Sequence, residues 1–373
     1  MKPGFRKKGK GLEYRFFYDG KRYSTTGLTE KECIDKSRAK ISLLASGVKI
    51  EAGKVTVREY YEEWLRRRTN IKASTKYAHE VSFKRILPII GDMRIVDVDS
   101  RDIDRVKAAM LPDLCDNTIN TRLGVLKAMF QDAVTDRIIV FNPCDAVKKV
   151  HRDKPVEKYI DPDSDSVRAL TQEEQALFFE YARGHWYYEL LAFLVSTGVR
   201  ISEAGALLWK DIDYENHEIR IYKTMTKSAA ATWSVGSTKT KKGARKLPLS
   251  DNTCKILASQ KVKISEHFGI ACVKPRMPVF RSLQTDRQIV PHMGDGAIRA
   301  ILSRIEADGK HIDHFSAHAL RDTFATRFIE QGGSMDTLRD LLGHANISIT
   351  MERYASVLPD RKKAELLRTE IVI

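Results

Sequence analysis

The sequence lacks the marks of several protein classes. Its five cysteines are scattered among 373 residues without a C-x-x-C pair, which fits neither a disulfide framework nor a thiolate zinc site. No apolar run approaches the ~20 residues that span a bilayer. The first residues also lack the apolar stretch of a signal peptide. We therefore expect a cytoplasmic protein with no membrane contact, and the length favours two or three domains.

Common catalytic motifs are also missing. The sequence has no G-x-x-x-x-G-K-[ST] loop, G-x-S-x-G elbow or H-E-x-x-H pair, so an ATP motor and the corresponding hydrolases are unsupported. His311, His314 and His318 have a spacing at which three histidines on one helix face bind zinc. However, Ser316 is an expected helix cap, which places the first two before that helix, and a fourth ligand is lacking. We predict no metal and no other cofactor.

Positive charge is in excess and unevenly distributed. There are 64 basic and 49 acidic residues, a net charge of +15. Residues 1–53 alone carry 13 basic and 6 acidic side chains, so nearly half of the excess lies in the first seventh of the chain. A concentrated field of this kind suits binding to a phosphate backbone. A solvated basic tail that aids solubility is the alternative.

The first 50 residues predict a β-hairpin followed by a helix. Two strand-like runs, residues 12–18 and 21–26, flank an Asp-Gly dipeptide, a strong hairpin signal. Thr29 and Glu32 then form a capping box that opens a helix. Strands of such a hairpin can read the major groove of DNA, although an ordinary small sheet with solvated basic residues fits nearly as well. The candidate DNA-binding residues here are Arg6, Lys7, Lys8, Arg15, Lys21 and Arg22.

Residues 54–150 predict a four-helix domain. A capping box at Thr56 and Glu59 opens the first helix, and apolar side chains recur at helical spacing over residues 57–65. Basic residues near helix starts or off the apolar stripes are candidates for gripping phosphates, although most exposed lysines bind nothing specific. These candidates are Lys72, Lys76, Arg122 and Lys127.

The rest of the chain predicts a mainly helical domain with a β insertion. Residues 151–168 contain two prolines and no apolar period, as in a linker between compact units. Helical patterns dominate from there on, except over residues 211–249, which predict a small sheet. Polar residues with catalytic potential follow in a distinctive order: Arg200 between a tight turn and a helix start, Lys239 on a basic turn, His318 and Arg321 three residues apart on a helix, His344 just after a helix, and Tyr354.

This combination suggests one reaction. A phosphodiester attacked by an oxygen passes through a five-coordinate phosphorus with extra negative charge, which arginine guanidinium groups neutralise bidentately. Attack by a tyrosine gives a covalent phosphotyrosine that conserves the bond energy for a later joining step. A histidine can take the phenolic proton, and a lysine can donate a proton to the leaving 5′ oxygen. Such a reaction requires no metal.

At these residues the sequence resembles the tyrosine recombinase (integrase) family, in particular integrases of phages and of Gram-positive conjugative transposons. The matching stretches are residues 197–203, 318–321 and 342–344, together with Tyr354. The resemblance extends over essentially the whole chain and implies a multi-domain, mainly α fold with small β-sheets. Its expected parts are an arm-type DNA-binding domain (1–50), a helical SAM-like core-binding domain (54–150), a linker (151–168), a mixed α+β catalytic domain (169–357) and a C-terminal tail (358–373).

The resemblance also implies a role for each polar residue. Arg200, Arg321 and His344 would hold the scissile phosphate. His318 would act as an acid or base, and Tyr354 would be the nucleophile that forms a 3′-phosphotyrosine.

The general acid is the least defined of these residues. The resemblance implies Lys239, but Lys241 and Lys242 lie on the same predicted turn. The tail at 358–373 ends in an apolar Ile-Val-Ile stretch, which a monomer rarely leaves exposed. Either it packs on its own protomer, or it docks on a neighbouring protomer as such tails do in this family.

The implied function is site-specific recombination that integrates and excises a mobile element. Expected partners are double-stranded DNA at core and arm sites, three further copies of the chain in a tetramer on DNA, and an excisionase or host DNA-bending protein. The free protein would be a monomer, in the bacterial cytoplasm in association with the nucleoid. Alternatives are a type IB topoisomerase, which shares the chemistry without exchanging partners, and a non-catalytic DNA-binding regulator.

Overall fold

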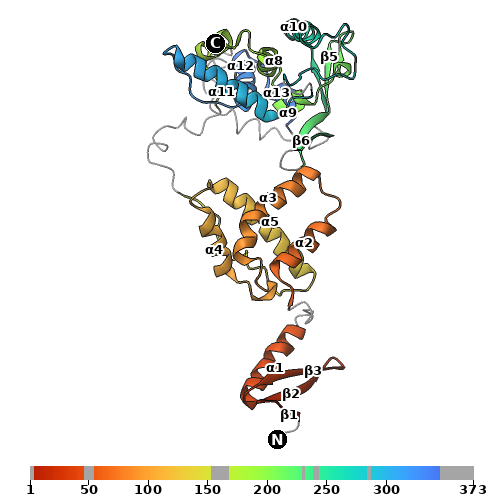
Figure 1. The fold of residues 1–373 in the computed structure, drawn as a ribbon, viewed down its shortest axis with the longest axis vertical. Helices are drawn as coiled ribbons and strands as arrows, with labels where there is room; N and C mark the ends of the chain where they lie inside the picture. Colours follow the sequence, from red (N-terminus) through yellow and green to blue (C-terminus); the bar gives the residue numbers. More distant parts are fainter. Residues whose placement is uncertain are drawn as a thin grey trace, which may run out of the picture. The chain divides into compact units, whose positions relative to one another are not determined.

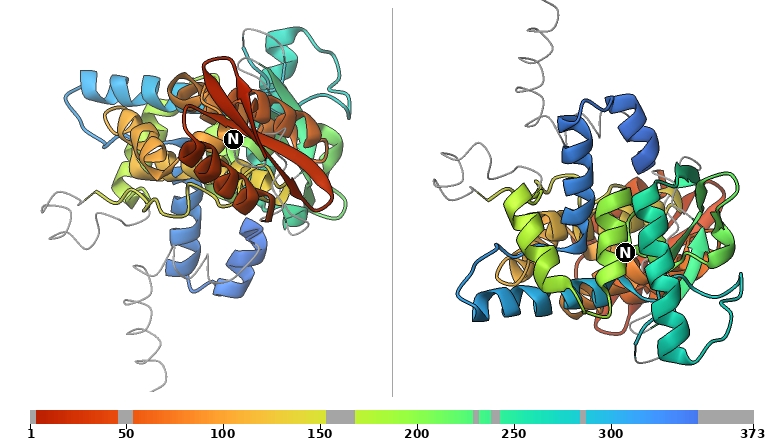
Figure 2. Two further views of the ribbon diagram at one scale, coloured as in Figure 1. Left: turned by 90° about the horizontal axis from the view of Figure 1, so that it is seen from below. Right: turned by 90° about the horizontal axis from the view of Figure 1, so that it is seen from above.

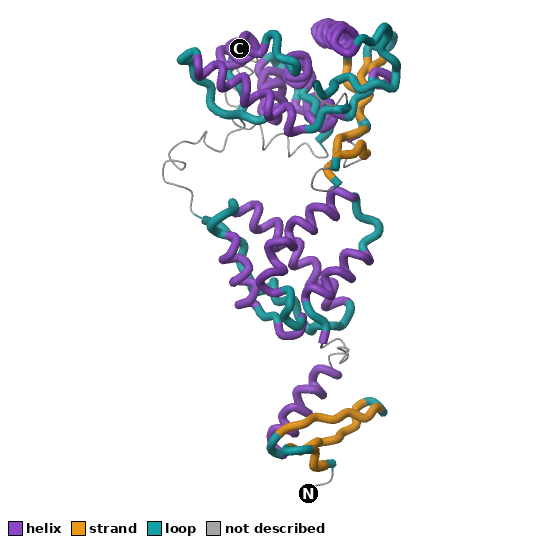
Figure 3. The backbone as a smooth tube through the Cα atoms, viewed as in Figure 1, coloured by secondary structure: helices purple, strands orange, loops and turns teal. Residues whose placement is uncertain are grey.

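The chain divides into two compact units, Met1–Asp153 and Lys154–Ile373. The computed structural model describes residues 4–45, 54–152, 168–228, 232–237, 243–283 and 287–344. Helices predominate, and the strands form small antiparallel sheets (Figures 1 and 3), so the predicted mainly α, multi-domain fold is confirmed. No helix in these described ranges is long and apolar enough to cross a membrane. The domain boundaries given above stay predictions.

The N-terminal module combines a three-stranded antiparallel sheet with one helix. Its elements are β1 (Phe5–Lys8), β2 (Gly11–Tyr18), β3 (Lys21–Gly27) and α1 (Glu30–Ala45), with strand order β1-β2-β3. The predicted hairpin is confirmed as β2 and β3. Asp19 and Gly20 between them both have positive φ, as the tight turns of two-residue hairpins require.

Strand β1 was not predicted. Its sequence, Phe-Arg-Lys-Lys, has too few apolar residues to show a strand pattern. It pairs with β2, placing Phe5 opposite Tyr14, and the two rings lie 4.6 Å apart between centroids. Cross-strand aromatic contact of this kind stabilises a pairing that a propensity argument overlooks.

The α1 helix covers one face of this sheet. Cys33 on α1 is fully buried, and its Sγ donates a hydrogen bond to the carbonyl of Leu12 on β2. Thr25 on β3 donates its hydroxyl hydrogen to the carbonyl of Cys33. Because side chains alternate across a strand, the other face of the sheet carries a separate set of residues.

Four main helices form the second module of the first unit. They are α2 (Val57–Arg67), α3 (Ala73–Ile90), α4 (Ser100–Met110) and α5 (Asp116–Thr135). The capping box of Thr56 and Glu59 is complete. Trp64 is buried in the core, and its indole N–H donates to Asp132 at 2.7 Å, so the polar edge of this large side chain is satisfied.

The second unit is mainly helical. Its helices are α7 (Gln172–Ala182), α8 (Tyr188–Thr197), α9 (Ile201–Gly205), α10 (Asp251–Phe268), α11 (Pro291–Ala307), α12 (Ala317–Glu330) and α13 (Met335–Leu342). The α8 helix contacts both α10 and α12 (Figure 2) and is buried over most of its length. Helix α8 therefore lies inside the unit, and its C-terminal turn is held in place by its neighbours.

In the part of the predicted β insertion that the structure describes there are two sheets, not one. Strands β4 (Ile212–Asp213), β5 (Glu218–Ile221) and β8 (Arg245–Pro248) form one sheet in the order β4-β5-β8, whereas β6 (Lys223–Lys227) pairs only with β7 (Trp233–Ser237) within the described residues. Strand β6 follows β5 after a single residue but does not pair with it. The β6–β7 hairpin is thus a separate ribbon between β5 and β8 in the sequence.

Candidate functional site

The turn between α8 and α9 positions Arg200. Gly198 ends α8 with a φ of 63°, and a Cβ at this position would collide with the ring of Phe324, so a glycine is required. Arg200 is the N-cap of α9, and its backbone N–H donates to the carboxylate of Glu203 at 3.1 Å. The turn predicted from the sequence is confirmed, and it fixes the backbone from which the Arg200 side chain extends.

Arg321 lies at the centre of the arrangement. It is only 1% exposed on α12. Its Nη1 donates to the carbonyl of Gly198 at 2.6 Å, and its Nη2 donates to the carbonyl of Leu342 at 2.7 Å and contacts Nε2 of His344 at 3.1 Å. A guanidinium only donates, so His344 Nε2 accepts and this neutral ring carries its proton on Nδ1. Arg321 therefore joins the Arg200 turn to the His344 turn.

His344 follows α13 as predicted. Gly343 ends the helix with a φ of 67°, and the backbone N–H of His344 donates to the carbonyl of Arg339 at 3.1 Å. This bond reaches back over a full turn, as in a Schellman motif. The His344 side chain is buried. The helix end thus places the imidazole directly beside Arg321.

A buried carboxylate, Glu203, links two arginines. Its Oε1 accepts from Arg200 Nη1 at 3.1 Å, and its two oxygens accept from Arg245 at 3.2 and 3.0 Å. Burial alone would raise the pKa of the Glu203 carboxyl, but the charges and hydrogen bonds of Arg245, then Arg200 and Arg321, hold that pKa below its ordinary value. Glu203 is therefore a carboxylate anion inside a cluster of guanidinium groups.

Sequence reasoning missed the parts played by Glu203 and Arg245. Glu203 belongs to the 197–203 motif, and its spacing of three from Arg200 would have suggested a pair on one helix face. No sequence signal marks Arg245, because it lies in a basic stretch and residue type alone does not show that this arginine is buried.

His318 occupies the first turn of α12. Its side chain is 50% exposed, and its Nε2 lies 4.0 Å from Oδ1 of the buried Asp322. His318 is thus one turn before Arg321 on the same helix, where its ring reaches solvent. His311 and His314 precede the helix, as predicted.

The structure brings together Arg200, Arg321 and His344, and places His318 on the same helix as Arg321. Lys239 and Tyr354 lie outside the described residues. So do the alternatives Lys241 and Lys242 and the tail at 358–373.

The six basic candidates of the N-terminal module lie on two different faces of the sheet. The strand register puts Lys7 and Lys21 on the side covered by α1. The opposite, uncovered side carries four of them, together with Phe17, which is 72% exposed. We call this side the outer face, and its basic residues are Arg6, Lys8, Arg15 and Arg22.

The candidates of the helical module also differ in their surroundings. Lys72 and Lys76 are exposed at the start of α3, where the positive end of a helix dipole adds to their charge. Arg122 is partly buried. Lys127 forms an ion pair with Asp145 at 2.8 Å, and its hydrogen bond and charge interaction with Asp145 raise the Lys127 pKa. Lys127 is therefore already paired with a carboxylate, although its side chain is 54% exposed.

Comparison with known protein families shows to which of them the chain belongs. Residues 164–361, more than half of the chain, match the model of the phage integrase family. The chain belongs to this family. Residues 56–110 match the N-terminal SAM-like domain of phage integrases. The protein is therefore a site-specific recombinase of the tyrosine type, and the predicted resemblance to integrases is confirmed.

Several curated relatives of this recombinase are named after mobile elements. The transposase of transposon Tn916 from Enterococcus faecalis is 24% identical over 387 residues, which cover 95% of this chain and 89% of that protein. The ICEBs1 integrase of Bacillus subtilis is 26% identical over 271 residues, covering 72% and 70%.

Solved structures share the recombinase's fold. The Tn1549 transposon integrase in complex with transposon right end DNA aligns with a TM-score of 0.68 at 24% identity, covering 85% of this chain and all of that one. A lambda integrase tetramer bound to a Holliday junction aligns with a TM-score of 0.56 at 16% identity, covering 93% and 96%. At these identities the likeness concerns the fold alone.

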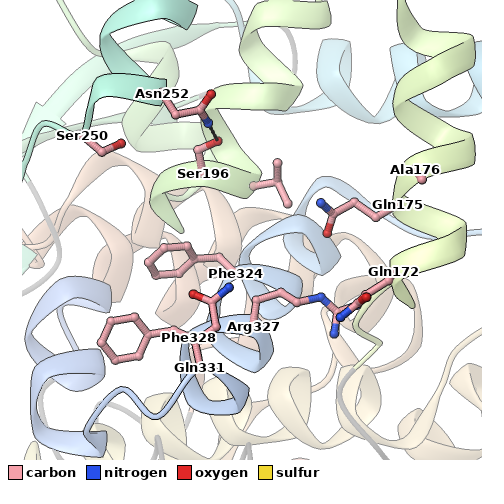
Figure 4. A pocket seen from close by; sticks show the side chains of 11 residues that line it. Gln172, Gln175, Ala176, Ser196, Ser250, Asn252, Phe324, Arg327, Phe328 and Gln331 are labelled. Atoms are coloured by element: carbon pink, nitrogen blue, oxygen red, sulfur yellow. Dashed lines mark hydrogen bonds between the residues drawn. The ribbon is translucent and has the colours of Figure 1, made fainter.

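The recombinase also has a pocket of about 640 Å³ outside the arginine cluster. Side chains from α7, α8 and α12 line it, including Phe324 and Phe328, and Asn252 donates to Ser196 at 3.2 Å at its edge (Figure 4). The charged side chain in its described lining, Arg327, is bonded to Glu330 and to the carbonyl of Leu170. The described lining residues therefore include no carboxylate, histidine or lysine that could act as an acid or base.

Proposed function

We propose that this recombinase cuts and rejoins DNA through a 3′-phosphotyrosine at Tyr354, and so integrates and excises a mobile element. One observation carries the proposal: Arg200, Arg321 and His344, from distant parts of the chain, are linked by hydrogen bonds around the C-terminal turn of α13. A cationic site of this kind stabilises the negative charge of a five-coordinate phosphorus.

Each residue has a proposed part in the reaction. Arg200, whose side chain is 36% exposed, binds a non-bridging phosphate oxygen. Arg321 supplies positive charge to the phosphate. His318 exchanges the proton of the Tyr354 hydroxyl, and Lys239 protonates the leaving 5′ oxygen. Rejoining reverses these steps, so no high-energy cofactor is consumed.

We propose double-stranded DNA as the partner, bound at two kinds of site. The helical module and the second unit would bind core sites, through residues that include Lys72, Lys76 and Arg122. The outer face of the N-terminal sheet would bind arm sites. Four copies would act together on two duplexes, and lambda integrase binds a Holliday junction as a tetramer. An excisionase or a host DNA-bending protein would set the direction.

A suicide substrate tests the reaction. The full-length protein is incubated with duplexes from the ends of its element, each nicked near the cleavage point so that the cut strand diffuses away. We expect a covalent adduct that survives denaturation, and peptide mapping should place a 3′-linked nucleotide on Tyr354. Binding without an adduct would instead support the regulator, and relaxation of supercoils without strand exchange would support the topoisomerase.

A separate prediction concerns DNA binding by the outer face. Arg22→Gln should weaken binding to a mixed-sequence duplex and reduce the slope of log K against log salt by about 1, since each lost phosphate contact releases one counterion fewer. Lys21→Gln is the matched control: it removes the same charge from the adjacent residue of β3, but on the side covered by α1. Titration at several salt concentrations measures both slopes. Equal losses in the two variants would mean that the outer face does not bind DNA.

A further inference from the structure

We propose that Arg245 is a positioning residue of the active site. Its guanidinium binds the carboxylate of Glu203, so that the guanidinium of Arg200 stays available to the DNA phosphate. Arg245 itself does not touch the substrate. The inference rests on the proposed function, because it assigns to Arg200 the phosphate contact proposed above.

Three elements meet at the Arg245 side chain. Arg245 is the first residue of β8, and its side chain is 6% exposed. Its Nη1 and Nη2 bind the two oxygens of Glu203 at 3.2 and 3.0 Å, a bidentate pair. Its Nε donates to the carbonyl of Leu341 on α13 at 2.6 Å. The planar guanidinium therefore uses two of its edges at once, which an ammonium group cannot do.

Arg245 and Arg200 share one carboxylate but differ in exposure. The guanidinium of Arg200 donates to Glu203 through Nη1 alone, beside the backbone N–H of the same residue, and the Arg200 side chain is 36% exposed, against 6% for Arg245. A buried anion needs compensation by a charge and by hydrogen bonds. Arg245 supplies both from inside the protein. Arg200 can then turn most of its donors toward a phosphate without leaving Glu203 uncompensated.

Loss of Arg245 would reverse this arrangement. Glu203 would stay buried, and Arg200 would be the arginine left to donate two hydrogen bonds to its carboxylate. The carboxylate and the phosphate would then compete for the guanidinium of Arg200. Arg200 would then stabilise the transition state less, although the residue is still present.

The contact with Leu341 has a second consequence. The last carbonyls of a helix have no donor within the helix and need donors from elsewhere. In α13, Arg245 donates a hydrogen bond to the carbonyl of Leu341, and Arg321 donates one to the carbonyl of Leu342. The turn that carries His344 is therefore held from two sides, and Arg245 influences both Arg200 and His344.

The test compares four full-length proteins on a nicked DNA duplex: wild type, Arg245→Gln, Glu203→Gln and the double variant. Single-turnover adduct formation, duplex affinity and the thermal unfolding midpoint are measured for each. We expect Arg245→Gln to slow adduct formation by about 10- to 100-fold, the range for outer-shell residues that orient the ligands of a metal site, with little change in duplex affinity. The double variant should recover much of this rate, because the neutral amide that replaces the Glu203 carboxylate no longer draws in Arg200.

Arg220→Gln is the matched control. Arg220 lies on β5, next to β8, and pairs with Asp213 at 2.9 Å with its side chain 52% exposed, so its loss should leave the rate unchanged. Should Arg245→Gln fail to fold, Arg245→Lys takes its place: it keeps the charge but not the bidentate geometry, and its rate should lie between those of wild type and the Gln variant.

The outcomes separate the two proposals. A wild-type protein that forms no adduct overturns the proposed function. A wild-type adduct with an unimpaired Arg245→Gln variant overturns the positioning role alone. A double variant that is folded but as slow as Arg245→Gln also overturns the positioning role. If Arg245 only supported the fold, replacing the Glu203 carboxylate by a neutral amide would not restore the rate of adduct formation.

Discussion

Replacing Tyr354 by Phe should abolish the covalent adduct with DNA and leave DNA binding intact. The substitution removes one oxygen, and in the proposed reaction that oxygen forms the bond to phosphorus. Without a nucleophile the remaining cationic groups can bind the phosphate but cannot cleave it. We expect a loss on the order of 10⁴-fold or more in single-turnover cleavage, as for removal of a nucleophile elsewhere. Denaturing gels of protein with end-labelled nicked duplex measure the adduct directly.

Tyr181→Phe is the matched control for this loss. Tyr181 lies in the same unit, and its exposed hydroxyl donates to Asp308 at 2.6 Å. Its removal should leave the adduct unchanged. If Tyr354→Phe still formed the adduct at the wild-type rate, another residue would be the nucleophile, and the order of motifs would have misled the assignment.

The parts of the site that sequence could predict are those fixed by local backbone chemistry. Gly198 and Gly343 end helices with positive φ, a conformation that favours glycine. Such turns are visible in the sequence as a glycine after a helical pattern. Arg200 and His344 follow these turns closely, so their placement beside helix ends followed from the same signal.

The parts that sequence could not predict depend on contacts between distant segments. Glu203 and Arg245 are 42 residues apart and become partners only when β8 and α9 come together. Periodicity separates apolar from polar positions, so it assigns a buried arginine to the surface. The same limit explains why the hydrogen-bond partners of Arg321 were not predictable.

The N-terminal sheet shows a third kind of limit. The Asp-Gly turn predicted the hairpin, and the turn also sets the register of β2 and β3. It does not say which face α1 covers. The sequence alone therefore does not divide the six basic candidates, whereas the register places Lys7 and Lys21 on the opposite side from Arg6, Lys8, Arg15 and Arg22. Only this division allows DNA-binding measurements on variants that change one face of the sheet at a time.

Arg321→Lys should impair both folding stability and catalysis, although it keeps the charge. Arg321 donates to the carbonyls of Gly198 and Leu342 and to His344 from the two ends of one plane. A lysine has one nitrogen and cannot reach acceptors on both sides. At least one buried carbonyl would then lose its donor, which costs about 1–3 kcal/mol in the free energy of unfolding. Urea denaturation measures this change.

The catalytic loss from Arg321→Lys should exceed what instability explains. At a temperature where the variant is fully folded, single-turnover cleavage should still fall by about 10²- to 10³-fold, the usual effect of removing one preorganised donor from a transition state. The cause is that His344 loses the neighbour that orients its ring, and the phosphate loses a guanidinium of fixed direction. Arg339→Lys on α13 is the control, because that arginine binds Asp336 and Asp340 at the surface and should tolerate the change. A folded Arg321→Lys protein that cleaves at the wild-type rate would show that point charge alone suffices here, and that the three hydrogen bonds serve only the fold.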